Sequence, residues 1–349
     1  MASPITDALS SVLGRFDLTA SLPFYYEQLS IGLINRSYKI YVGKKATQAS
    51  YLLQQINTRI FQRPAQLMEN IGRVGAYLAN TSYPRQVLRP LPTCDGSYFW
   101  KTAEGLYWRV FPFIANSQSF RSVDSVDLAY EAAFTFGEYA RYLADFDANC
   151  LHITIPDFHN TPLRFQHFKS AVKAASSDRL AKAKNVILTL EAWKPLLALY
   201  PPLQSHLRVV HYDTKISNVL LDVHSGQGIC IVDLDTLMPG MLAYDFGDMV
   251  RTFTPAVDEN EQVLEKVVAR SDMLSATHAG FLDGLKDRIS RAERLQLMDG
   301  VQLIIFEQAM RFATDYLMGD VYYPVSYEMQ NLRRAENQCR LLSDLLEKI

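Results

Sequence analysis

The chain has 349 residues, a formal net charge of -2 and 48% hydrophobic residues. This length favours two domains with a substantial buried core. The near balance of acidic and basic residues points to neither nucleic acid nor an anionic membrane as a partner.

The sequence also indicates the compartment. It begins without a basic segment followed by an apolar one, and no uninterrupted apolar run reaches membrane-spanning length. The four cysteines are far apart and form no C-x-x-C pair, which argues against a zinc site or a disulfide framework. We therefore expect a cytoplasmic protein, a monomer or weak homodimer, with no membrane and no nucleic-acid partner.

The N-terminal part of the chain predicts a small sheet with one helix. Strands are expected at residues 38–42 and 50–54, followed by a helix that begins at Pro64. Apolar residues recur at helical spacing along that helix, namely Leu67, Ile71, Val74 and Leu78. Two more strands are expected at residues 98–102 and 107–111. Pro112 interrupts the last strand, and we expect a linker between two lobes there.

The rest of the chain is largely helical in pattern. The strongest helical segments are residues 128–146, 179–200, 260–282, 290–317 and 326–347. Short strands at residues 207–210, 219–222 and 228–232 lie among them, with a turn at 225–228. These elements predict an α+β fold with two lobes, residues 1–111 and 112–349, and a cleft at their junction.

The segment between the first two of these short strands carries the main chemical motif. It reads His211-Tyr212-Asp213-Thr214-Lys215-Ile216-Ser217-Asn218, and Asp233 follows the third strand. The spacing matches the kinase catalytic loop H-R-D-x-x-x-x-N with a later metal-binding Asp. Phosphoryl transfer needs positioning and charge neutralisation, so oxygen ligands must lie near a hydroxyl acceptor. We predict that Asp213 orients the attacking hydroxyl and that Asn218 and Asp233 hold Mg²⁺.

Several of these residues also have a plainer interpretation. An isolated loop Asp such as Asp213 commonly forms an Asx-turn, but Asn218 and Asp233 at these spacings favour catalysis. His211 is expected to brace the loop as a packed structural histidine. For Asp235, support of the metal site, metal contact and substrate contact all stay open.

A literal Asp-Phe-Gly occurs at residues 245–247 and suggests a different metal ligand. Asp233 follows a run of β-branched residues and lies nearer the catalytic loop, whereas Asp245 comes after the turn signal Pro239-Gly240. We therefore assign the metal to Asp233. Asp245 is expected to cap backbone amides or to pair with Arg251.

Taken together, these segments resemble the aminoglycoside phosphotransferase and choline kinase group, which shares the protein-kinase-like fold. The closer resemblance is to the N-acetylhexosamine 1-kinases and extends over about residues 32–323. It is carried by residues 51–57, 67–71, 155–161, 211–218, 231–236 and 238–248. The blocks at 51–57 and 155–161 are similar to the hexosamine branch in particular.

The resemblance implies an ATP- and Mg²⁺-dependent kinase that phosphorylates the C1 hydroxyl of an N-acetylhexosamine. The N-terminal lobe would bind the nucleotide, with Phe113 of the linker near the adenine. The C-terminal lobe would bind the sugar, with Asp213 acting on the anomeric hydroxyl. Asp235, Arg311 and Tyr322 fall at positions implied to contact the sugar.

Arg311 also has a rationale in helical spacing. Glu307, Arg311 and Asp315 recur every four residues, so the two carboxylates are placed to hold the guanidinium in a fixed pose. The alternative is a solvated row of ion pairs, each stabilising the helix by about 0.2–0.5 kcal/mol.

Two departures from the kinase pattern concern phosphate binding. The chain has no G-x-G-x-x-G loop; residues 32–38 occupy that place, and we assign Asn35 and Arg36 to the nucleotide. Gln54 stands where a kinase strand carries its phosphate-binding Lys, and it supplies no charge. Glu69 on the following helix therefore lacks a Lys partner and is expected to be a solvated helix residue.

Two alternatives to a hexosamine kinase stay open. The first keeps the fold but takes another small hydroxyl substrate, such as an aminoglycoside, an amino alcohol or another hexose. The second is a pseudokinase that binds nucleotide or sugar without transferring phosphate. The complete set of Asp213, Asn218 and Asp233 argues against the pseudokinase, whereas Gln54 favours it.

Overall fold

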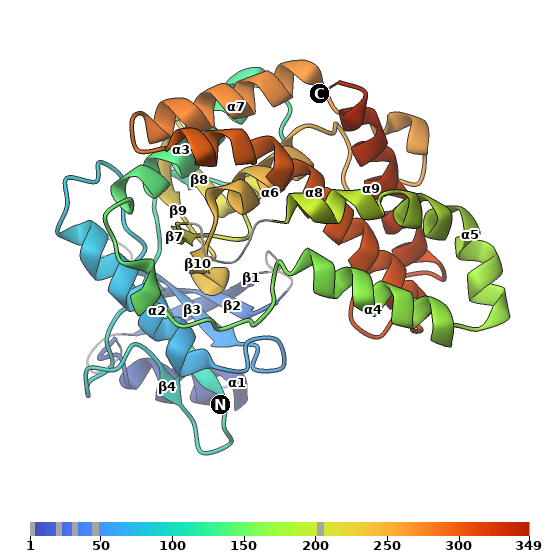
Figure 1. The fold of residues 1–349 in the computed structure, drawn as a ribbon. Helices are drawn as coiled ribbons and strands as arrows, with labels where there is room; N and C mark the ends of the chain where they lie inside the picture. The colour runs from blue at the N-terminus through green and yellow to red at the C-terminus, as the bar shows by residue number, and fades with distance from the viewer. Residues whose placement is uncertain (1–3, 19–22, 30–33, 44–48, 201–205, 349) are drawn as a thin grey trace.

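A small lobe built on an antiparallel sheet lies beside a larger, mainly helical lobe in the computed structural model, which describes residues 4–18, 23–29, 34–43, 49–200 and 206–348 (Figure 1). The sheet has five strands in the order β1-β2-β3-β5-β4. Their bounds are Phe24–Leu29 (β1), Arg36–Val42 (β2), Ala49–Ile56 (β3), Trp100–Lys101 (β4) and Tyr107–Pro112 (β5).

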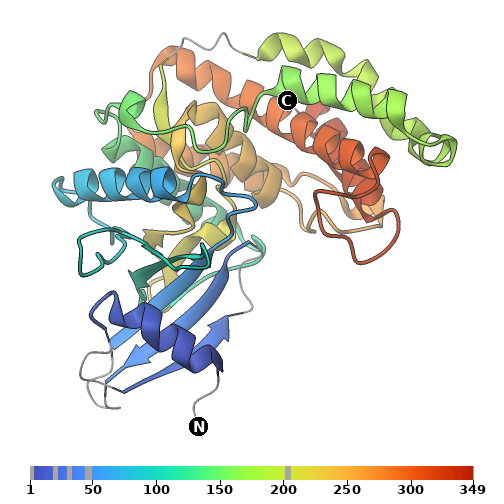
Figure 2. The ribbon, with the colours of Figure 1, turned by 90° about the horizontal axis from the view of Figure 1, so that it is seen from below.

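Side-chain alternation gives this sheet two different faces. Ile40 of β2, Leu53 of β3 and Val110 of β5 are buried on one face, beneath α1 (Pro4–Gly14), which lies across the strands (Figure 2). On the other face Gln54 and Arg109 stand opposite one another in register. That face turns toward the large lobe. The polar side chains of Gln54 and Arg109 therefore lie at the junction of the lobes.

Helix α2 (Pro64–Ala79) connects the two lobes. It begins at the predicted proline and buries the four apolar residues expected from its spacing. Asn70 is also buried, and its side-chain amide donates to the carbonyl oxygens of His152 (2.8 Å) and Leu237 (3.0 Å). Because an unpaired buried amide would be costly, these bonds fix how α2 sits on the large lobe.

Seven helices of more than three turns make up most of the described large lobe. They are α3 (Val126–Tyr142), α4 (Thr161–Ala174), α5 (Ser177–Ala192), α6 (Leu242–Phe253), α7 (Ser271–Leu285), α8 (Arg291–Leu317) and α9 (Gln330–Leu346). The short strands are β6 (Ser117–Gln118), β7 (Arg208–Val210), β8 (Val219–Asp222), β9 (Gly228–Ile231) and β10 (Met238–Gly240). The longest helix, α8, begins with a capping box between Ser290 and Glu293.

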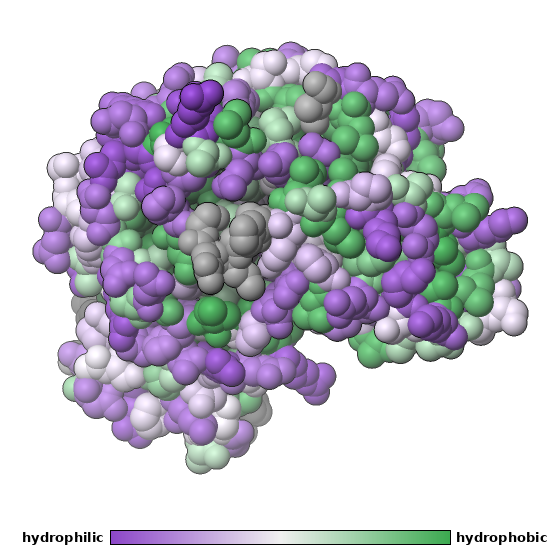
Figure 3. Space-filling model, in the orientation of Figure 1, coloured by the Kyte–Doolittle hydropathy of each residue, from purple (hydrophilic) through white to green (hydrophobic). Residues whose placement is uncertain are grey.

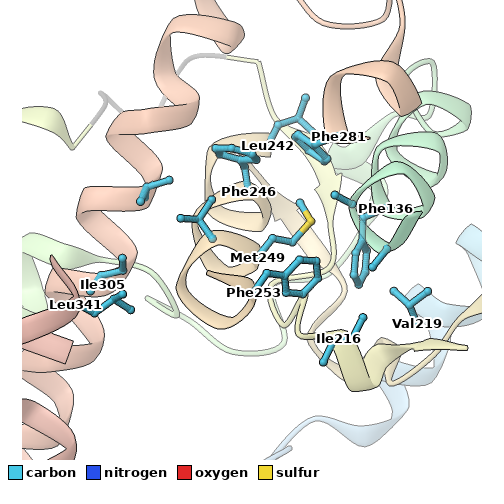
Figure 4. Close-up of a cluster of buried hydrophobic side chains, with 14 of the residues drawn as sticks. Phe136, Ile216, Val219, Leu242, Phe246, Met249, Phe253, Phe281, Ile305 and Leu341 are labelled. Atoms are coloured by element: carbon cyan, nitrogen blue, oxygen red, sulfur yellow. The ribbon is translucent and has the colours of Figure 1, made fainter. Parts of the chain in front are cut away.

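Most residues of helix α6 are buried, and side chains from other helices surround it (Figure 4). Its residues Phe246, Met249 and Phe253 are fully buried, and Phe136 of α3 and Phe281 of α7 pack around them. A helix enclosed on all sides is a rigid mount for the polar side chains at its N-terminal end.

Helices α3 and α7 pack closely because glycines lie between them. A Cβ atom added to Gly284 would lie 2.3 Å from the carbonyl oxygen of Phe134 and 2.6 Å from the amide of Glu138. We expect Gly284→Ala to lower the free energy of unfolding by about 1–3 kcal/mol through overpacking. Urea denaturation measures this loss, and Ser275→Ala, on an exposed position of the same helix, serves as the control. Equal stability of the two variants would contradict the close-packing argument.

Most predicted elements are present, with three corrections. Pro112 does not interrupt the last strand, because β5 includes it and Phe113 still donates its amide to β3. The helix expected at residues 260–282 begins only at Ser271, and residues 264–266 form a 3₁₀ turn. The Arg270 guanidinium binds the carbonyl oxygens of Phe253 and Thr254, so tertiary contacts override the helical pattern there. The helix expected at residues 179–200 ends at Ala192, and a 3₁₀ segment that includes Pro195 continues it. The lobe boundary between residues 111 and 112 stays a prediction.

The face of the molecule shown in Figure 3 offers no simple cue to function. Hydrophilic and hydrophobic residues are interspersed over the face shown in Figure 3. Among the described residues, no helix combines the length and the apolarity needed to cross a membrane.

Candidate active site

The catalytic loop at residues 211–218 and the segment at 232–233 are tied together by Val232. Its backbone N–H donates to the carbonyl oxygen of Asn218 (2.9 Å), and its carbonyl oxygen accepts from Nε2 of His211 (2.9 Å). The residue just before Asp233 is therefore bonded to both ends of the loop. The structure thus brings Asp213, Asn218 and Asp233 together, with Asn218 just before β8 and Asp233 just after the paired strand β9.

Asp245 supports this loop from α6. Its carboxylate accepts hydrogen bonds from the backbone amides of His211 (2.9 Å) and Tyr212 (2.8 Å). Burial raises the pKa of the Asp245 carboxyl to about 6. The predicted capping role is confirmed, while Arg251 pairs with Asp248 instead. The turn expected at residues 239–240 is wrong, since Pro239 and Gly240 belong to β10.

Loss of this cap should be costly. We expect Asp245→Ala to lower the free energy of unfolding by about 2–5 kcal/mol, because two amide donors near the core lose their acceptor. Asp245→Asn retains one acceptor oxygen and should fall between wild type and alanine. Denaturant unfolding measures both, with Asp283→Ala as the control, because among the described residues that exposed carboxylate accepts just one hydrogen bond, from the hydroxyl of Tyr130. Similar losses at the two positions would count against the capping role.

Asp213 lies in the loop with one carboxylate oxygen engaged. Its Oδ2 accepts from Nζ of Lys215 (2.7 Å) and from Nδ2 of Asn218 (3.0 Å). Within the described part of the chain, no hydrogen bond is made to Oδ1. Burial disfavours the charged form, but the Lys215 charge and its hydrogen bond hold the pKa of the Asp213 carboxyl below its usual value. An ionised carboxylate with one unengaged oxygen suits the orientation of a hydroxyl group.

Asp233 has the features of a cation ligand. Its backbone is left-handed, with φ 59° and ψ 54°, and its side chain is exposed. Desolvation by the surrounding protein, followed by the negative charges of Asp235 and Asp213, raises the pKa of the Asp233 carboxyl to about 7. This excess of negative charge is what a divalent cation would relieve. Because Asn218 donates through Nδ2 to Asp213, its Oδ1 can act as a second hard oxygen ligand, so the residues present fit magnesium.

Asp235 lies behind this site rather than in it. The residue is 2% exposed, and its carboxylate is bound bidentately by the Arg109 guanidinium. Nδ2 of Asn35 donates to the same carboxylate at 2.7 Å. Contact with a sugar or a metal would require Asp235 to leave both partners. The geometry therefore argues against the predicted substrate contact and favours the supporting role that the sequence had left open.

Comparison with known proteins then decides the family. A family model, APH, described as the phosphotransferase enzyme family, matches residues 26–274, more than half of the chain. The chain belongs to this family. It is a small-molecule kinase of the APH family.

Solved structures share its fold. A microcompartment-associated aminopropanol kinase is 15% identical, with 98% of each chain covered and a TM-score of 0.65. An amicoumacin kinase in complex with AMP-PNP, Ca²⁺ and Ami is 14% identical, covering 90% of this chain and 87% of that one, with a TM-score of 0.59. A choline kinase from Cryptosporidium parvum Iowa II is 12% identical over 98% of this chain and 97% of that one, also at 0.59. These likenesses show the protein-kinase-like fold that the sequence predicts.

The side chains predicted to contact the nucleotide in this APH-family kinase differ in whether they already have hydrogen-bond partners in the protein. Arg36 is exposed at the start of β2, whereas the side chain of Asn35 is held between Asp235 and the amide of Asn57. Gln54 is likewise engaged, by Ser37 and Arg109. The side chains of Asn35 and Gln54 are thus not available to phosphate as they stand, which argues against those two predictions. The glycine-containing start of the predicted phosphate segment, residues 32–33, lies outside the described residues.

Sequence reasoning missed two cations of this APH-family kinase. Lys39 lies with its ammonium 4.0 Å from the ring centroid of Phe113, on the same face of β2 as Ser37. The alternation of β2 could have placed it on the cleft side of the sheet. Lys215 follows Asp213 by two residues and binds its carboxylate, and only the loop geometry shows that contact. Phe113 itself donates its amide to the carbonyl oxygen of Ser50 at 3.0 Å.

The predicted acceptor residues lie near a group of aromatic rings. The Phe158 and His159 rings lie 5.5 and 5.3 Å from that of Tyr212, next to Asp213. The Arg311 guanidinium lies 5.6 Å from the Phe158 ring. Tyr322, on the loop after α8, is 62% exposed. These positions put Arg311 on the side of the catalytic loop where the block at residues 155–161 lies.

The expectation that carboxylates hold Arg311 is wrong. Glu307 instead accepts from Thr161 (2.9 Å) and pairs with His159 (3.0 Å). Asp315 accepts from the backbone amides of residues 321–323. Both carboxylates lie near better-fixed donors, which helical spacing alone does not reveal. Glu69, by contrast, is an exposed helix residue as predicted, paired with Arg73 and His152.

Proposed function

We propose that this APH-family kinase transfers the γ-phosphoryl group of ATP to the C1 hydroxyl of an N-acetylhexosamine. The observation that carries the proposal is the contact between Tyr212 of the catalytic loop and Phe158 and His159, which belong to the block that resembles the hexosamine branch. A block peculiar to that branch is expected to lie where the acceptor is selected.

The roles of the chain's own residues follow from the geometry of the loop. Oδ1 of Asp213 is free to accept the proton of the acceptor hydroxyl, while Lys215 and Asn218 hold Oδ2. An anomeric hydroxyl is more acidic than an ordinary alcohol, so one aligned carboxylate is sufficient assistance. Asp233 and Asn218 would hold Mg²⁺, which when bound neutralises charge on the phosphates. The AMP-PNP and Ca²⁺ in the amicoumacin kinase support ATP and a divalent cation here.

Charge on the acceptor side favours a neutral sugar over a cationic substrate. Arg311 places a positive group beside Phe158, while the nearby carboxylates of Glu307 and Asp315 are already engaged. An aminoglycoside or an amino alcohol would need unpaired carboxylates to offset its ammonium groups. A neutral hexosamine has no such need.

A substrate panel tests the proposal. The protein is incubated with ATP, Mg²⁺ and one acceptor at a time, drawn from N-acetylhexosamines, plain hexoses, amino alcohols and aminoglycosides. We expect phosphorylation of the N-acetylhexosamines, with phosphorus-31 NMR showing coupling to the anomeric proton. Phosphate at another position, or preference for a cationic acceptor, would replace this function by the first alternative. Failure to consume ATP with every acceptor would favour the pseudokinase.

A further inference from the structure

A buried ion pair joins the small-lobe sheet to the segment that carries Asp233. Arg109 of β5 is 1% exposed and Asp235 is 2% exposed. Nη2 of Arg109 donates to Oδ2 of Asp235 at 2.9 Å, and Nη1 donates to Oδ1. Desolvation offsets most of the attraction in a pair this deeply buried, so stability alone is a weak explanation for it. We therefore look for a role of the Arg109–Asp235 pair in the active site.

The guanidinium is held in one orientation by the sheet. Nε of Arg109 donates to Oε1 of Gln54 at 3.0 Å, and Nε2 of Gln54 donates to Oγ of Ser37 at 3.0 Å. One hydrogen-bonded row thus runs across β2, β3 and β5 and ends at Asp235. Gln54 supplies no charge, but its amide oxygen fixes the direction in which Arg109 points.

Asp235 in turn limits where Asp233 can point. Asp235 lies two residues after Asp233, in the single 3₁₀ turn Leu234–Thr236. On the other side of Asp233, Val232 is bonded to both ends of the catalytic loop. Asp233 itself has a left-handed backbone, which is costly for a residue with a side chain and persists only when its surroundings impose it. The bonds to Val232 and Asp235 are the surroundings that do so.

We propose that Arg109 is a positioning residue for the divalent metal, acting through Asp235 on the direction of the Asp233 carboxylate. The small-lobe sheet thereby sets the metal affinity of a ligand that belongs to the large lobe. Arg109 also neutralises Asp235, so that this third carboxylate does not compete for the cation. The inference rests on the metal in the proposed function and is independent of the acceptor.

Metal binding tests the proposal without any acceptor. Mn²⁺ is titrated into the full-length protein with saturating ADP, and free Mn²⁺ is followed by electron paramagnetic resonance. Arg109→Lys keeps the charge but cannot bind a carboxylate through two parallel bonds. We expect it to weaken Mn²⁺ binding about 10–100-fold, the usual effect of losing a partner that orients a metal ligand. ADP binding without metal should change by less than about twofold, because Arg109 is 1% exposed and offers no surface to a nucleotide.

The matched control is Arg85→Lys. Arg85 follows α2 and pairs with Glu138 of α3 at 2.7 Å, with side chains 11% and 8% exposed. It is likewise a largely buried pair joining the two lobes, but its carboxylate belongs to α3 and not to a residue beside Asp233. We expect Arg85→Lys to reduce thermal stability about as much as Arg109→Lys while leaving Mn²⁺ affinity unchanged.

A second variant, in which both members of the pair are neutral, tests the proposal if Arg109→Lys does not fold. The double variant Arg109→Gln with Asp235→Asn removes both charges and leaves no unpaired buried ion. It too should bind Mn²⁺ at least about tenfold more weakly. Wild-type Mn²⁺ affinity in a folded variant, or equal loss in Arg85→Lys, overturns the proposal, as does an absence of Mn²⁺ binding by the wild type. If Mn²⁺ binds as expected but no hexosamine is phosphorylated, only the acceptor assignment fails.

Discussion

Replacing Asp213 with Asn is expected to lower kcat by about 10²–10⁴-fold, the usual contribution of a positioned general base. The amide keeps the size of the side chain but cannot take the proton of the acceptor hydroxyl. KM for both substrates should change much less, because the group acts mainly in the transition state. Initial rates with the best acceptor of the panel measure the effect.

Folding must be separated from chemistry in this variant. Asp213→Asn removes the ion pair with Lys215, so its thermal unfolding is compared with that of Lys215→Met, which breaks the same pair. Asp222→Asn, at the last residue of β8, controls for the exchange of carboxylate for amide, because the Asp222 carboxylate accepts only from the exposed turn that follows, among the described residues. Turnover near the wild-type value in folded Asp213→Asn would remove this residue from the mechanism.

Asp233→Asn is expected to cost about 10³-fold in kcat/KM at low magnesium. A bound cation supplies several kcal/mol of charge stabilisation, and each 1.4 kcal/mol or so is a factor of ten. Part of the loss should be recovered at high Mg²⁺, because an amide oxygen remains a weak ligand. Rates over a range of Mg²⁺ concentrations measure the effect, with EDTA-treated wild type as the reference.

The same substitution in the Asp-Phe-Gly segment discriminates between the two candidate ligands. Asp245→Asn should leave the Mg²⁺ concentration at half-maximal rate unchanged, because its carboxylate faces the amides of His211 and Tyr212. A rightward shift for Asp245→Asn but none for Asp233→Asn would reverse the assignment of the metal.

The spacing of apolar residues along the sequence correctly predicted the helices and strands in which that spacing is regular. Helix α2 has its proline at the start and four apolar residues in step, and α8 has a capping box at the predicted Ser290. The catalytic loop was likewise accessible, because its spacing is fixed by the chemistry it serves. Asp213, Asn218 and Asp233 do lie together, and their roles stay predictions that the variants above address.

Contacts between distant parts of the chain were beyond such patterns. Arg109 looks like an ordinary strand residue until the register of β3 and β5 places it against Gln54, and Asp235 is 126 residues away. The carboxylates of Glu307 and Asp315 have the right spacing for Arg311, but Thr161 and the amides after α8 lie closer. Burial and competition among hydrogen-bond donors determine which partners these side chains have. Neither effect can be read from a single segment of the sequence.

The tetrapeptide at residues 245–248 shows how misleading a familiar string can be. Asp245 binds the catalytic loop, Phe246 is fully buried, a Cβ on Gly247 would lie 2.5 Å from the carbonyl oxygen of Gly300, and Asp248 pairs with Arg251. Each of these four residues thus makes a structural contact that accounts for its identity. If Asp233 holds the metal as we predict, annotation that ranks kinases by Asp-Phe-Gly would mark a different carboxylate, that of Asp245 in α6, beyond β10. Automated curation of such proteins should weigh the neighbouring strand end before the signature.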